Sequence, residues 1–525
     1  MEEKFKGLGC LLLDQAVKNP SRTCLIFGGR KLSFREIHEK ASLLSQLLKK
    51  HSINKGDKVA LWTYNCPEYV VSYFAVLYCG GVVVPVNAMF KREEARHVIA
   101  DSGAGAVICC SERLDDVVNL NLRLDTIRSV FSYRFNVLKY QSVLDIYQDP
   151  VKAGFSPQAE IEDAAGDDTA QIIYTSGTTG KPKGACLSHG NVMSNVRDCS
   201  SVFEVKQKDT FICILPMYHA FSLTVTVLLP LYKGSKIVVF RSVAPFRRVI
   251  RSIRKNRISI FVAVPPFYNL LKDKKISWAA STFLMPFMNP LRLCISGASP
   301  LASTTISAFE KKFKVPLLEG YGLTEASPVV SFNPSEEPRP GSVGRPLPSV
   351  EVKIVDSNCK QVVPGAVGEL LVRGPNVMRG YYKQPESDKE IFADGWLRTG
   401  DLCRMDKDGY IYIEGRLKEM INVRGMNVYP KEIEELLYTL SYIKEAAVIG
   451  VNHPRKGEVP VVFVVPEETA VVTSRNISAF LKDNLAVYKL PYKIEIREEL
   501  PKNSTGKILK YVLKQDFERG MTRSR

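Results

Sequence analysis

The stretch Tyr174-Thr-Ser-Gly-Thr-Thr-Gly-Lys-Pro-Lys-Gly184 decides how the rest of the chain is interpreted. Four hydroxyl side chains, two lysines and three glycines fall within these eleven residues. Gly177, Gly180 and Gly184 let the backbone approach an oxyanion closely, and successive backbone amides can form an anion-binding nest. Because Ala170-Gln-Ile-Ile173 predicts a strand, we expect a polyphosphate-binding loop at a strand end.

The spacing within this loop argues against a P-loop hydrolase. The phosphate loop of those enzymes has a glycine, four further residues and then Gly-Lys-Ser/Thr. Here the glycine that bears the lysine, Gly180, comes too early, and Pro182 follows Lys181. A merely flexible turn is the alternative interpretation, and the density of phosphate-binding groups argues against it.

The composition is that of a large globular protein. The 525 residues are 45% apolar and 24% charged, which excludes disorder, collagen and a coiled coil. Three or four folding units of roughly 100–200 residues are expected.

The net charge of +17 favours polyanionic partners, namely nucleotides, nucleic acid or an anionic membrane surface, without choosing among them. Twelve scattered cysteines without a C-x-x-C spacing predict neither a zinc framework nor a thioredoxin motif.

The alternation of apolar and amphipathic segments predicts an α/β fold with largely parallel sheets. After Gly341, short strands between Gly/Pro turns predict a β-rich subdomain. We therefore predict a large, multi-layered N-terminal domain over residues 1–415, with two α/β subdomains and a small β-rich subdomain at about 341–415. A small, mobile α+β C-terminal domain is expected over residues 416–525.

Residues 211–232 resemble a membrane-spanning segment, because these 22 consecutive residues carry no formal charge and are long enough to cross a bilayer. Pro216, His219 and Pro230 interrupt the stretch, and a bilayer interior demands that backbone groups be satisfied. We expect instead a buried segment around an apolar cavity, with a single span as the alternative.

Further motifs occur in order along the chain at the spacing of one enzyme family. Together with residues 174–184 they make the sequence similar to the adenylate-forming superfamily, which includes acyl-CoA synthetases, luciferases and peptide-synthetase adenylation domains. The resemblance covers roughly residues 10–515 and is closest to bacterial long-chain fatty acid–CoA ligases. The motifs are Leu215-Pro-Met-Tyr-His219, Leu318-Glu-Gly-Tyr-Gly-Leu-Thr-Glu325, Asp394-Gly-Trp-Leu-Arg-Thr-Gly-Asp401, Gly415-Arg-Leu-Lys-Glu-Met-Ile421 and Pro501-Lys-Asn-Ser-Thr-Gly-Lys-Ile508.

The resemblance implies an ATP- and AMP-binding site in which a purine stacks on Tyr321 while Asp401 and Arg416 bind the ribose. Glu325 and Thr175 are expected to hold Mg²⁺, a hard cation that prefers carboxylate and phosphate oxygens. Taken singly, such residues are more often packed turns or surface ion pairs. The full expected nucleotide site is Thr175, Ser176, Gly177, Thr178, Thr179, Gly180, Lys181, Gly297, Ala298, Ser299, Gly320, Tyr321, Gly322, Thr324, Asp401 and Arg416.

Lys507 is expected to be catalytic together with Thr175 and Glu325. Residues 501–506 predict a turn, with Lys507 opening a helix on the mobile domain. By resemblance, its ammonium bridges the substrate carboxylate and the α-phosphate of ATP. An exposed lysine at a helix start is the ordinary alternative.

The same resemblance places His219, Phe221 and Leu223 beside the acyl tunnel. Some long-chain members carry a tryptophan gate near these positions, and its absence here leaves chain length and gating open. The hinge reads Arg416-Leu-Lys-Glu419 instead of Arg-Lys-Lys-Asp, which leaves open whether Lys418 or Glu419 pivots.

The sequence therefore predicts an AMP-forming acid–thiol ligase. A fatty acid, long-chain by resemblance, reacts with ATP to give acyl-AMP and pyrophosphate, and the acyl group then passes to CoA. The enzyme alternatives are a ligase for aryl or medium-chain acids and one that loads an acyl carrier protein. A basic membrane- or nucleic-acid-binding module without catalysis would explain the charge but not the motifs.

The expected partners are the fatty acid, ATP and CoA. Nucleic acid is not an expected partner, and whether the protein forms a homodimer is left open. The N-terminus lacks a signal peptide, which favours a cytoplasmic protein.

The run from Arg241 to Arg257 holds seven basic residues and no acidic one, and its apolar residues share one helical face. A solvated helix is the ordinary interpretation. Our hypothesis is peripheral contact with anionic lipid on the inner face of the membrane.

Overall fold

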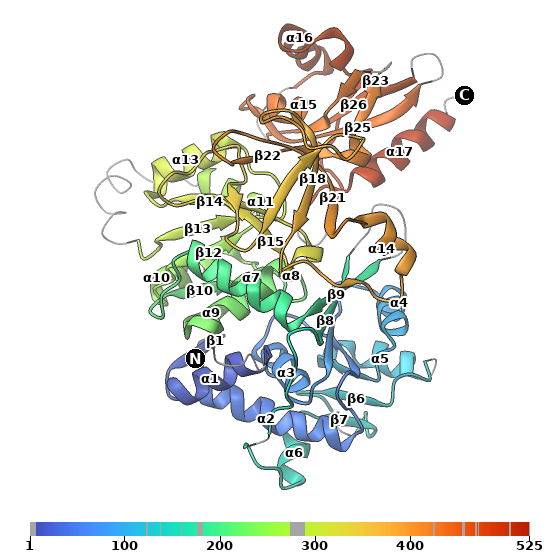
Figure 1. Cartoon of the computed structure of the whole chain (residues 1–525). Helices are drawn as coiled ribbons and strands as arrows, with labels where there is room; N and C mark the ends of the chain where they lie inside the picture. Colours follow the sequence, from blue (N-terminus) through green and yellow to red (C-terminus); the bar gives the residue numbers. More distant parts are fainter. Residues whose placement is uncertain are drawn as a thin grey trace.

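A large N-terminal domain and a smaller C-terminal domain make up the structure, a computed structural model in which the C-terminal domain lies at the top of Figure 1. The fold confirms the predicted α/β class. The residues that the structure describes are 7–121, 124–136, 138–158, 160–175, 182–273, 289–423, 426–453, 457–467, 470, 472–502 and 506–523.

The first sheet of the N-terminal domain is mainly parallel, as the alternating pattern predicts. Its central strands are buried on both faces, which explains their nearly continuous apolar sequences. The order of its eight strands is β19 (Gly380–Tyr381), β9 (Lys183–Ser188), β8 (Thr169–Thr175), β4 (Val82–Pro85), β3 (Lys58–Trp62), β5 (Ala106–Cys109), β6 (Ser129–Ser132) and β7 (Val143–Asp145).

The second sheet is parallel at its centre and antiparallel at both edges. One hydrophobic core joins residues from both large sheets and the helices between them. The order of its nine strands is β16 (Arg345–Pro346), β15 (Val329–Phe332), β14 (Leu317–Gly322), β13 (Leu293–Ser296), β12 (Ile260–Ala263), β10 (Thr210–Cys213), β11 (Lys236–Val239), β1 (Thr23–Phe27) and β2 (Arg30–Ser33).

A β-rich layer follows residue 341, as predicted, and forms an antiparallel sheet of five strands. In this sheet β22 pairs with β21 at the register Asp401↔Arg416. The strands are β17 (Glu351–Val355), β18 (Gly368–Arg373), β20 (Phe392–Ala393), β21 (Trp396–Met405) and β22 (Ile411–Arg416).

The C-terminal domain has its own sheets and its own apolar clusters. No described strand after Arg416 pairs with an earlier sheet. The boundary at residue 415 stays a prediction, and this separation of the sheets is consistent with it. The strands are β23 (Ile421–Val423), β24 (Met426–Val428), β25 (Ile443–His453), β26 (Gly457–Pro466) and β27 (Lys493–Ile496).

The helices cover the sheets, and their ends follow local sequence signals. For α2, the Ser33 side chain accepts a bond from the Glu36 amide while the Glu36 side chain accepts one from the Ser33 amide. The helices are α1 (Cys10–Lys18), α2 (Phe34–Lys50), α3 (Pro67–Tyr78), α4 (Arg92–Ser102), α5 (Leu114–Asn121), α6 (Gln148–Lys152), α7 (His189–Val202), α8 (Ala220–Ser222), α9 (Leu229–Lys233), α10 (Phe246–Lys255), α11 (Pro265–Asp273), α13 (Ser303–Phe313), α14 (Pro385–Ile391), α15 (Pro430–Tyr438), α16 (Ser474–Asn484) and α17 (Lys510–Arg523).

The uncharged segment at 211–232 lies inside the N-terminal domain. It contains β10, a loop, α8, a π-helical turn (Leu223–Leu228) and α9. Every residue of the π-helical turn is buried in the protein core. Among the described residues, no helix combines the length and apolar character that crossing a bilayer requires.

Candidate functional site

The predicted phosphate loop connects the ends of an antiparallel hairpin. Strands β8 and β9 pair as far as Thr175↔Lys183, and β4 lies parallel to β8 on its other side. Ser176, Gly177, Thr178, Thr179, Gly180 and Lys181 lie outside the described residues.

Two flanking residues of this loop also have structural partners. A Cβ atom on Gly184 would lie 2.7 Å from Cγ2 of Ile172, so packing across the hairpin requires glycine there. Lys183 donates to the Ser387 hydroxyl over 2.7 Å, and its ammonium lies 5.3 Å from the centre of the Tyr381 ring. The anion-binding role of Gly184 and Lys183 stays a prediction.

Tyr321, Asp401 and Arg416 form one bonded chain across three strands. The Tyr321 hydroxyl donates to one carboxylate oxygen of Asp401 over 2.5 Å, and Nε of Arg416 lies 2.7 Å from the other. Only 4% of the Asp401 side chain is exposed. Burial raises the pKa of Asp401, whereas the Arg416 charge and the Tyr321 hydrogen bond favour its ionised form. Each carboxylate oxygen can accept a second bond, so Asp401 keeps acceptor capacity for a ligand.

The small residues expected to wall the adenine pocket follow β13 and end β14, whose carboxyl ends lie side by side. A Cβ atom on Gly297 would lie 2.9 Å from the Phe221 ring, so the structure brings two predicted site residues into contact. Ala298 has a positive φ of 68° and is exposed, and Ser299 is half-buried. This loop therefore offers accessible backbone beside Tyr321.

Gly320 and Gly322 are small for reasons of packing. A Cβ atom would lie 2.8 Å from the Phe332 ring at Gly320 and 2.1 Å from the Pro328 carbonyl oxygen at Gly322. Close pairing of β14 with β15 therefore explains both glycines without a nucleotide.

Glu319 is a buried carboxyl group that the sequence analysis missed. Its Oε1 accepts a hydrogen bond of 3.0 Å from the Leu301 amide and so fixes the loop that follows Ser299. Burial raises the pKa of Glu319 to about 7, although the Leu301 amide and the Lys431 charge favour ionisation. Lys431 belongs to α15 and donates to the Ile413 carbonyl over 2.6 Å, so it links α15 to β22.

Glu325 lies in a short 3₁₀ turn with Thr324 (Thr324–Ala326), next to the phosphate hairpin. Its Oε1 accepts a bond of 2.7 Å from the Tyr381 hydroxyl, and Tyr381 pairs with Ala185 of β9. No cluster of three or more His, Cys, Asp or Glu side chains that could hold a metal occurs within the described part of the chain. One carboxylate together with substrate phosphates is nevertheless a common ligand set for Mg²⁺, so Glu325 and Thr175 fit the expected ion.

His219, Phe221 and Leu223 follow the loop after β10 but differ in burial. His219 is half-buried beside the Tyr218 ring, at 4.7 Å between centres, and burial lowers its pKa to about 4. Neutral imidazole is therefore its form at physiological pH. Phe221 lies against Gly297, whereas Leu223 is completely buried in the core.

Lys507 is close enough to Asp401, Arg416 and Glu419 to interact with their charges. Its side chain keeps exposed surface, but partial dehydration by the surrounding protein and repulsion from Arg416 lower its pKa. Helix α17 begins at Lys510, so the prediction that Lys507 opens this helix was wrong. Ser504 and Thr505 of the predicted turn lie outside the described residues.

Lys510 is a second charged residue that the sequence analysis missed. Its ammonium lies 3.0 Å from Glu419 in the predicted hinge and 2.9 Å from Glu434 of α15. Lys418 is exposed, whereas Glu419 is half-buried and held by this pair. The segment that carries Lys507 is thus tied to the hinge by its own following helix.

The sequence matches two family models: AMP-binding enzyme over residues 12–382, and the AMP-binding enzyme C-terminal domain over residues 432–507. The chain therefore belongs to the AMP-binding enzyme family, and the resemblance to adenylate-forming enzymes is confirmed.

Its relatives place it among acyl-CoA ligases. A long-chain-fatty-acid–CoA ligase of Salmonella typhimurium is 32% identical over 98% of this chain and 95% of the relative. A feruloyl-CoA synthase of an Amycolatopsis species is 30% identical over 98% of this chain and 99% of the relative. The crystal structure of ATP-bound MatB from Rhodopseudomonas palustris superposes with a TM-score of 0.89 at 31% identity, over 98% of this chain and 99% of that one.

Glu319 gives a pH-dependent prediction. Because its folded-state pKa lies above its ordinary value of 4.5, its contribution to stability is fully present below about pH 4.5 and is lost as pH rises through about 7. Glu319→Gln keeps the carbonyl acceptor for Leu301 and removes the titration. We expect the variant to gain stability relative to the parent between pH 5 and pH 8, by about 2–3 kcal/mol at most.

Thermal unfolding of both proteins at the two pH values measures this difference. Glu336→Gln, at an exposed carboxylate, is the matched control and should show no such change. A stability difference for Glu319→Gln that does not vary with pH would contradict the assignment.

Proposed function

We propose that this protein is an ATP-dependent fatty acid–CoA ligase. The observation that carries the proposal is the position of Lys507, which interacts electrostatically with Asp401 of the N-terminal domain and with Arg416 at the predicted boundary. A lysine from the mobile domain thus reaches the residues proposed to bind the nucleotide. Family membership and the named relatives support the same chemistry.

In the proposed first half-reaction, a carboxylate oxygen of the acid attacks the α-phosphorus of ATP. The bond to pyrophosphate breaks, and acyl-AMP forms. Asp401 and Arg416 hold the ribose, the Tyr321 ring stacks on the adenine, and the hairpin loop that starts at Thr175 binds the phosphates. Glu325 and Thr175 would hold Mg²⁺, which would supply positive charge to the phosphate oxygens.

Lys507 is proposed to bridge the acid carboxylate and the α-phosphate. Its ammonium offsets the negative charge that grows as the new phosphorus–oxygen bond forms. The nearby carboxylates Asp401 and Glu419 favour its protonated form. The acid carboxylate and the phosphates of ATP are all anionic. A cation positioned between the carboxylate and the α-phosphate therefore lowers the activation barrier by reducing their mutual repulsion.

In the proposed second half-reaction, the sulfur of CoA attacks the acyl carbonyl after losing its proton, and AMP leaves. We propose that the C-terminal domain turns about Lys418 between the two steps. Glu419 is fixed to Lys510, so it moves with the C-terminal domain, whereas the preceding Lys418 is exposed. The mobile unit would then begin after Lys418, within the predicted C-terminal domain of residues 416–525.

The preferred substrate is proposed to be a long-chain fatty acid, with His219, Phe221 and Leu223 along the acyl site. The uncharged, buried segment 211–232 supports an apolar substrate. An aryl acid is the second candidate, because a feruloyl-CoA synthase is almost as similar as the fatty acid ligases. A medium-chain acid as substrate, or an acyl carrier protein as acceptor, is a further candidate.

A panel of acids tests the function directly. Pyrophosphate release is measured with fatty acids of increasing length and with hydroxycinnamic and benzoic acids, each with CoA or a carrier protein as acceptor. We expect the highest kcat/KM with long-chain fatty acids and CoA. No acid-dependent exchange of pyrophosphate into ATP would contradict ligase function altogether.

Lys507→Ala tests the assignment of the catalytic lysine. We expect acyl-AMP formation to fall by about 10²–10³-fold or more, because one preorganised charge is removed, while ATP still binds. With preformed acyl-AMP and CoA, thioester formation should stay near the parent rate. Equal losses in both half-reactions of a folded variant would show that Lys507 does not act in adenylation alone.

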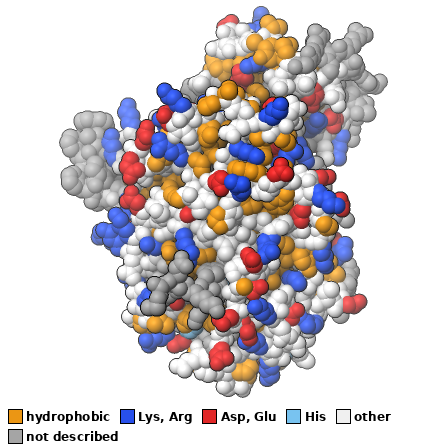
Figure 2. All heavy atoms as spheres, in the orientation of Figure 1, with side chains coloured by type: hydrophobic (Ala, Val, Ile, Leu, Met, Phe, Trp, Pro, Cys, Tyr) orange, Lys and Arg blue, Asp and Glu red, His pale blue; other side chains and the backbone are white. Residues whose placement is uncertain are grey.

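We also propose weak peripheral contact with anionic membranes through α10. Figure 2 shows basic side chains gathered on the left flank, where α10 lies in Figure 1. Arg247 and Arg254 are exposed on one face of this helix. A cytoplasmic enzyme with such a surface could collect poorly soluble acids at the inner membrane face, whereas a homodimer stays an open prediction.

Co-sedimentation with phosphatidylglycerol-containing vesicles tests this contact. We expect binding at low salt that falls at high salt, since exposed charges are screened. Arg247→Gln/Arg254→Gln should weaken the binding severalfold. Equal binding to neutral and anionic vesicles at low salt would reject the idea.

A further inference from the structure

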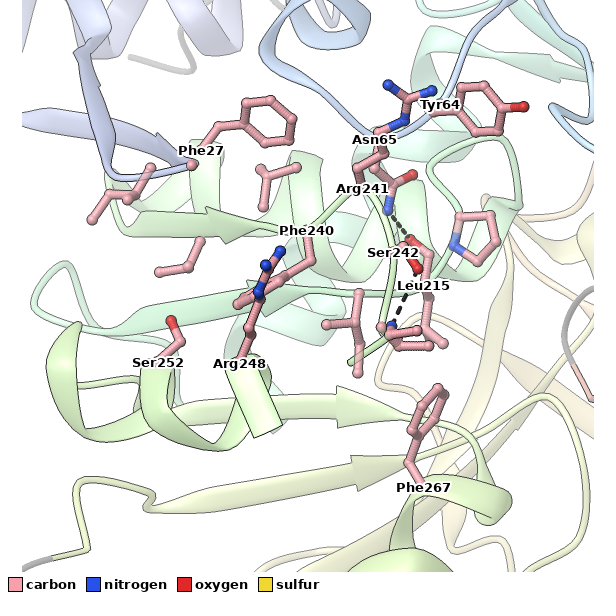
Figure 3. Close-up of a pocket in the computed structure, with 18 of the residues that line it drawn as sticks. Phe27, Tyr64, Asn65, Leu215, Phe240, Arg241, Ser242, Arg248, Ser252 and Phe267 are labelled. Carbon is pink, nitrogen blue, oxygen red and sulfur yellow. Dashed lines mark hydrogen bonds between the residues drawn. The ribbon is translucent and has the colours of Figure 1, made fainter. Parts of the chain in front are cut away.

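A cavity of about 1210 Å³ lies beside the candidate site, between the two large sheets. It opens at the carboxyl ends of β1, β3, β10, β11 and β12, which bring their following loops together. The side chain of Asn65 ties two of these loops. Its amide nitrogen donates to the Leu215 carbonyl over 2.8 Å (Figure 3). Its oxygen accepts from the Met217 amide over 2.8 Å. The wall of the cavity is thus preformed.

The lining changes character from one end to the other. Apolar side chains such as Val239, Phe240 and Phe267 form the floor. Arg248, Arg251 and Lys255 line another wall from α10, with Arg248 extending toward Phe240 in Figure 3. No Asp or Glu is among the described residues that line the cavity.

These three cations and Lys31 differ from Arg241 and Lys502, the other two basic side chains of the cavity. Arg241 lies 2.6 Å from Glu112, and Lys502 is paired with Glu445. Arg248, Arg251 and Lys255 are exposed, and none of them has a carboxylate partner among the described residues. Three neighbouring cations without partners repel one another, and an anionic ligand would relieve that repulsion.

The cavity also reaches the reacting end of the site. Pro216 and Tyr218, directly before His219, line it, and so does Gly506, directly before Lys507. A ligand that fills it would therefore have one end near the catalytic lysine and another near α10. Its anionic part would lie at the end remote from the reaction.

This distribution of charge distinguishes between the substrates of the proposed reaction. A fatty acid carries its charge on the reacting carboxylate, so its apolar tail would meet the cations of α10, which is unfavourable. CoA carries its phosphates on the nucleotide, at the far end of a neutral arm from the reacting thiol. The charge pattern of the cavity matches CoA and not the acid.

We propose that the face of α10 formed by Arg248, Arg251 and Lys255 binds the phosphates of the CoA nucleotide, and that this face makes CoA the preferred acceptor. The proposal rests on the proposed ligase function. It separates the basic residues of α10 into two groups, because Arg247 and Arg254 do not line the cavity. The 3′-phosphate is the group that only CoA, and not dephospho-CoA, can present to these cations.

The test compares CoA with dephospho-CoA as acceptors. In Arg248→Gln/Arg251→Gln/Lys255→Gln we expect the KM for CoA to rise by at least about tenfold and the preference for CoA over dephospho-CoA to disappear. The KM for ATP, the KM for the acid and the rate of pyrophosphate exchange should not change. Arg247→Gln/Arg254→Gln, assayed without membranes, is the matched control and should keep the parent preference.

Two results would overturn the proposal. One is a folded triple variant with unchanged KM for CoA and an unchanged ratio between the two acceptors. The other is a shifted preference for acid chain length, which would assign the cavity to the acyl group. Titration calorimetry measures the affinity of the protein for CoA and for dephospho-CoA without turnover. Absence of pyrophosphate exchange in the parent protein would therefore contradict the ligase function but not this inference.

Discussion

The buried carboxylate of Asp401 is the group on which the arrangement of the candidate site depends. A carboxylate that is almost fully removed from water costs several kcal/mol unless donors surround it. Tyr321 and Arg416 supply these donors from β14 and β22, while Asp401 itself comes from β21. Loss of either donor would leave one oxygen of a buried carboxylate without its partner, so the large sheet, the β-rich layer and the start of the hinge are coupled energetically.

The same electrostatic pattern continues into the C-terminal domain. Beyond Arg416, the charges of Glu419, Lys510 and Glu434 alternate in sign, and Lys507 lies beside them. The apolar clusters of the C-terminal domain are separate from the core of the large domain, and Lys507 interacts with the charge of Asp401 across the predicted boundary. Contacts between charges can be exchanged at low cost, which suits the rotation proposed for this domain.

Local features of the fold could be predicted well from the sequence. The strands Glu351–Val355 and Gly368–Arg373 are of the short kind predicted after Gly341, because alternation and flanking turns determine short antiparallel strands locally. The start of α2 is likewise determined locally, by Ser33 and Glu36, and the helix Pro67–Tyr78 has a proline in its first turn. Long-range partners were not visible: Lys183 bonds Ser387, 204 residues away. The glycines of β14 have a packing reason that depends on β15, and the environment of Glu319 includes the Leu301 amide and the charge of Lys431 from α15.

The basic run from Arg241 to Arg257 illustrates what a sequence pattern leaves undetermined. Periodicity identifies the apolar face correctly, since Val249 and Ile253 are buried and Phe246 and Ile250 half-buried. A helix that buries one face still has two polar flanks, and periodicity cannot tell which flank meets a cavity and which meets solvent. In this chain the flank with Arg248, Arg251 and Lys255 lines the cavity, whereas the flank with Arg247 and Arg254 does not. Part of the excess positive charge of the protein therefore lines the cavity, at the site proposed for the phosphates of CoA.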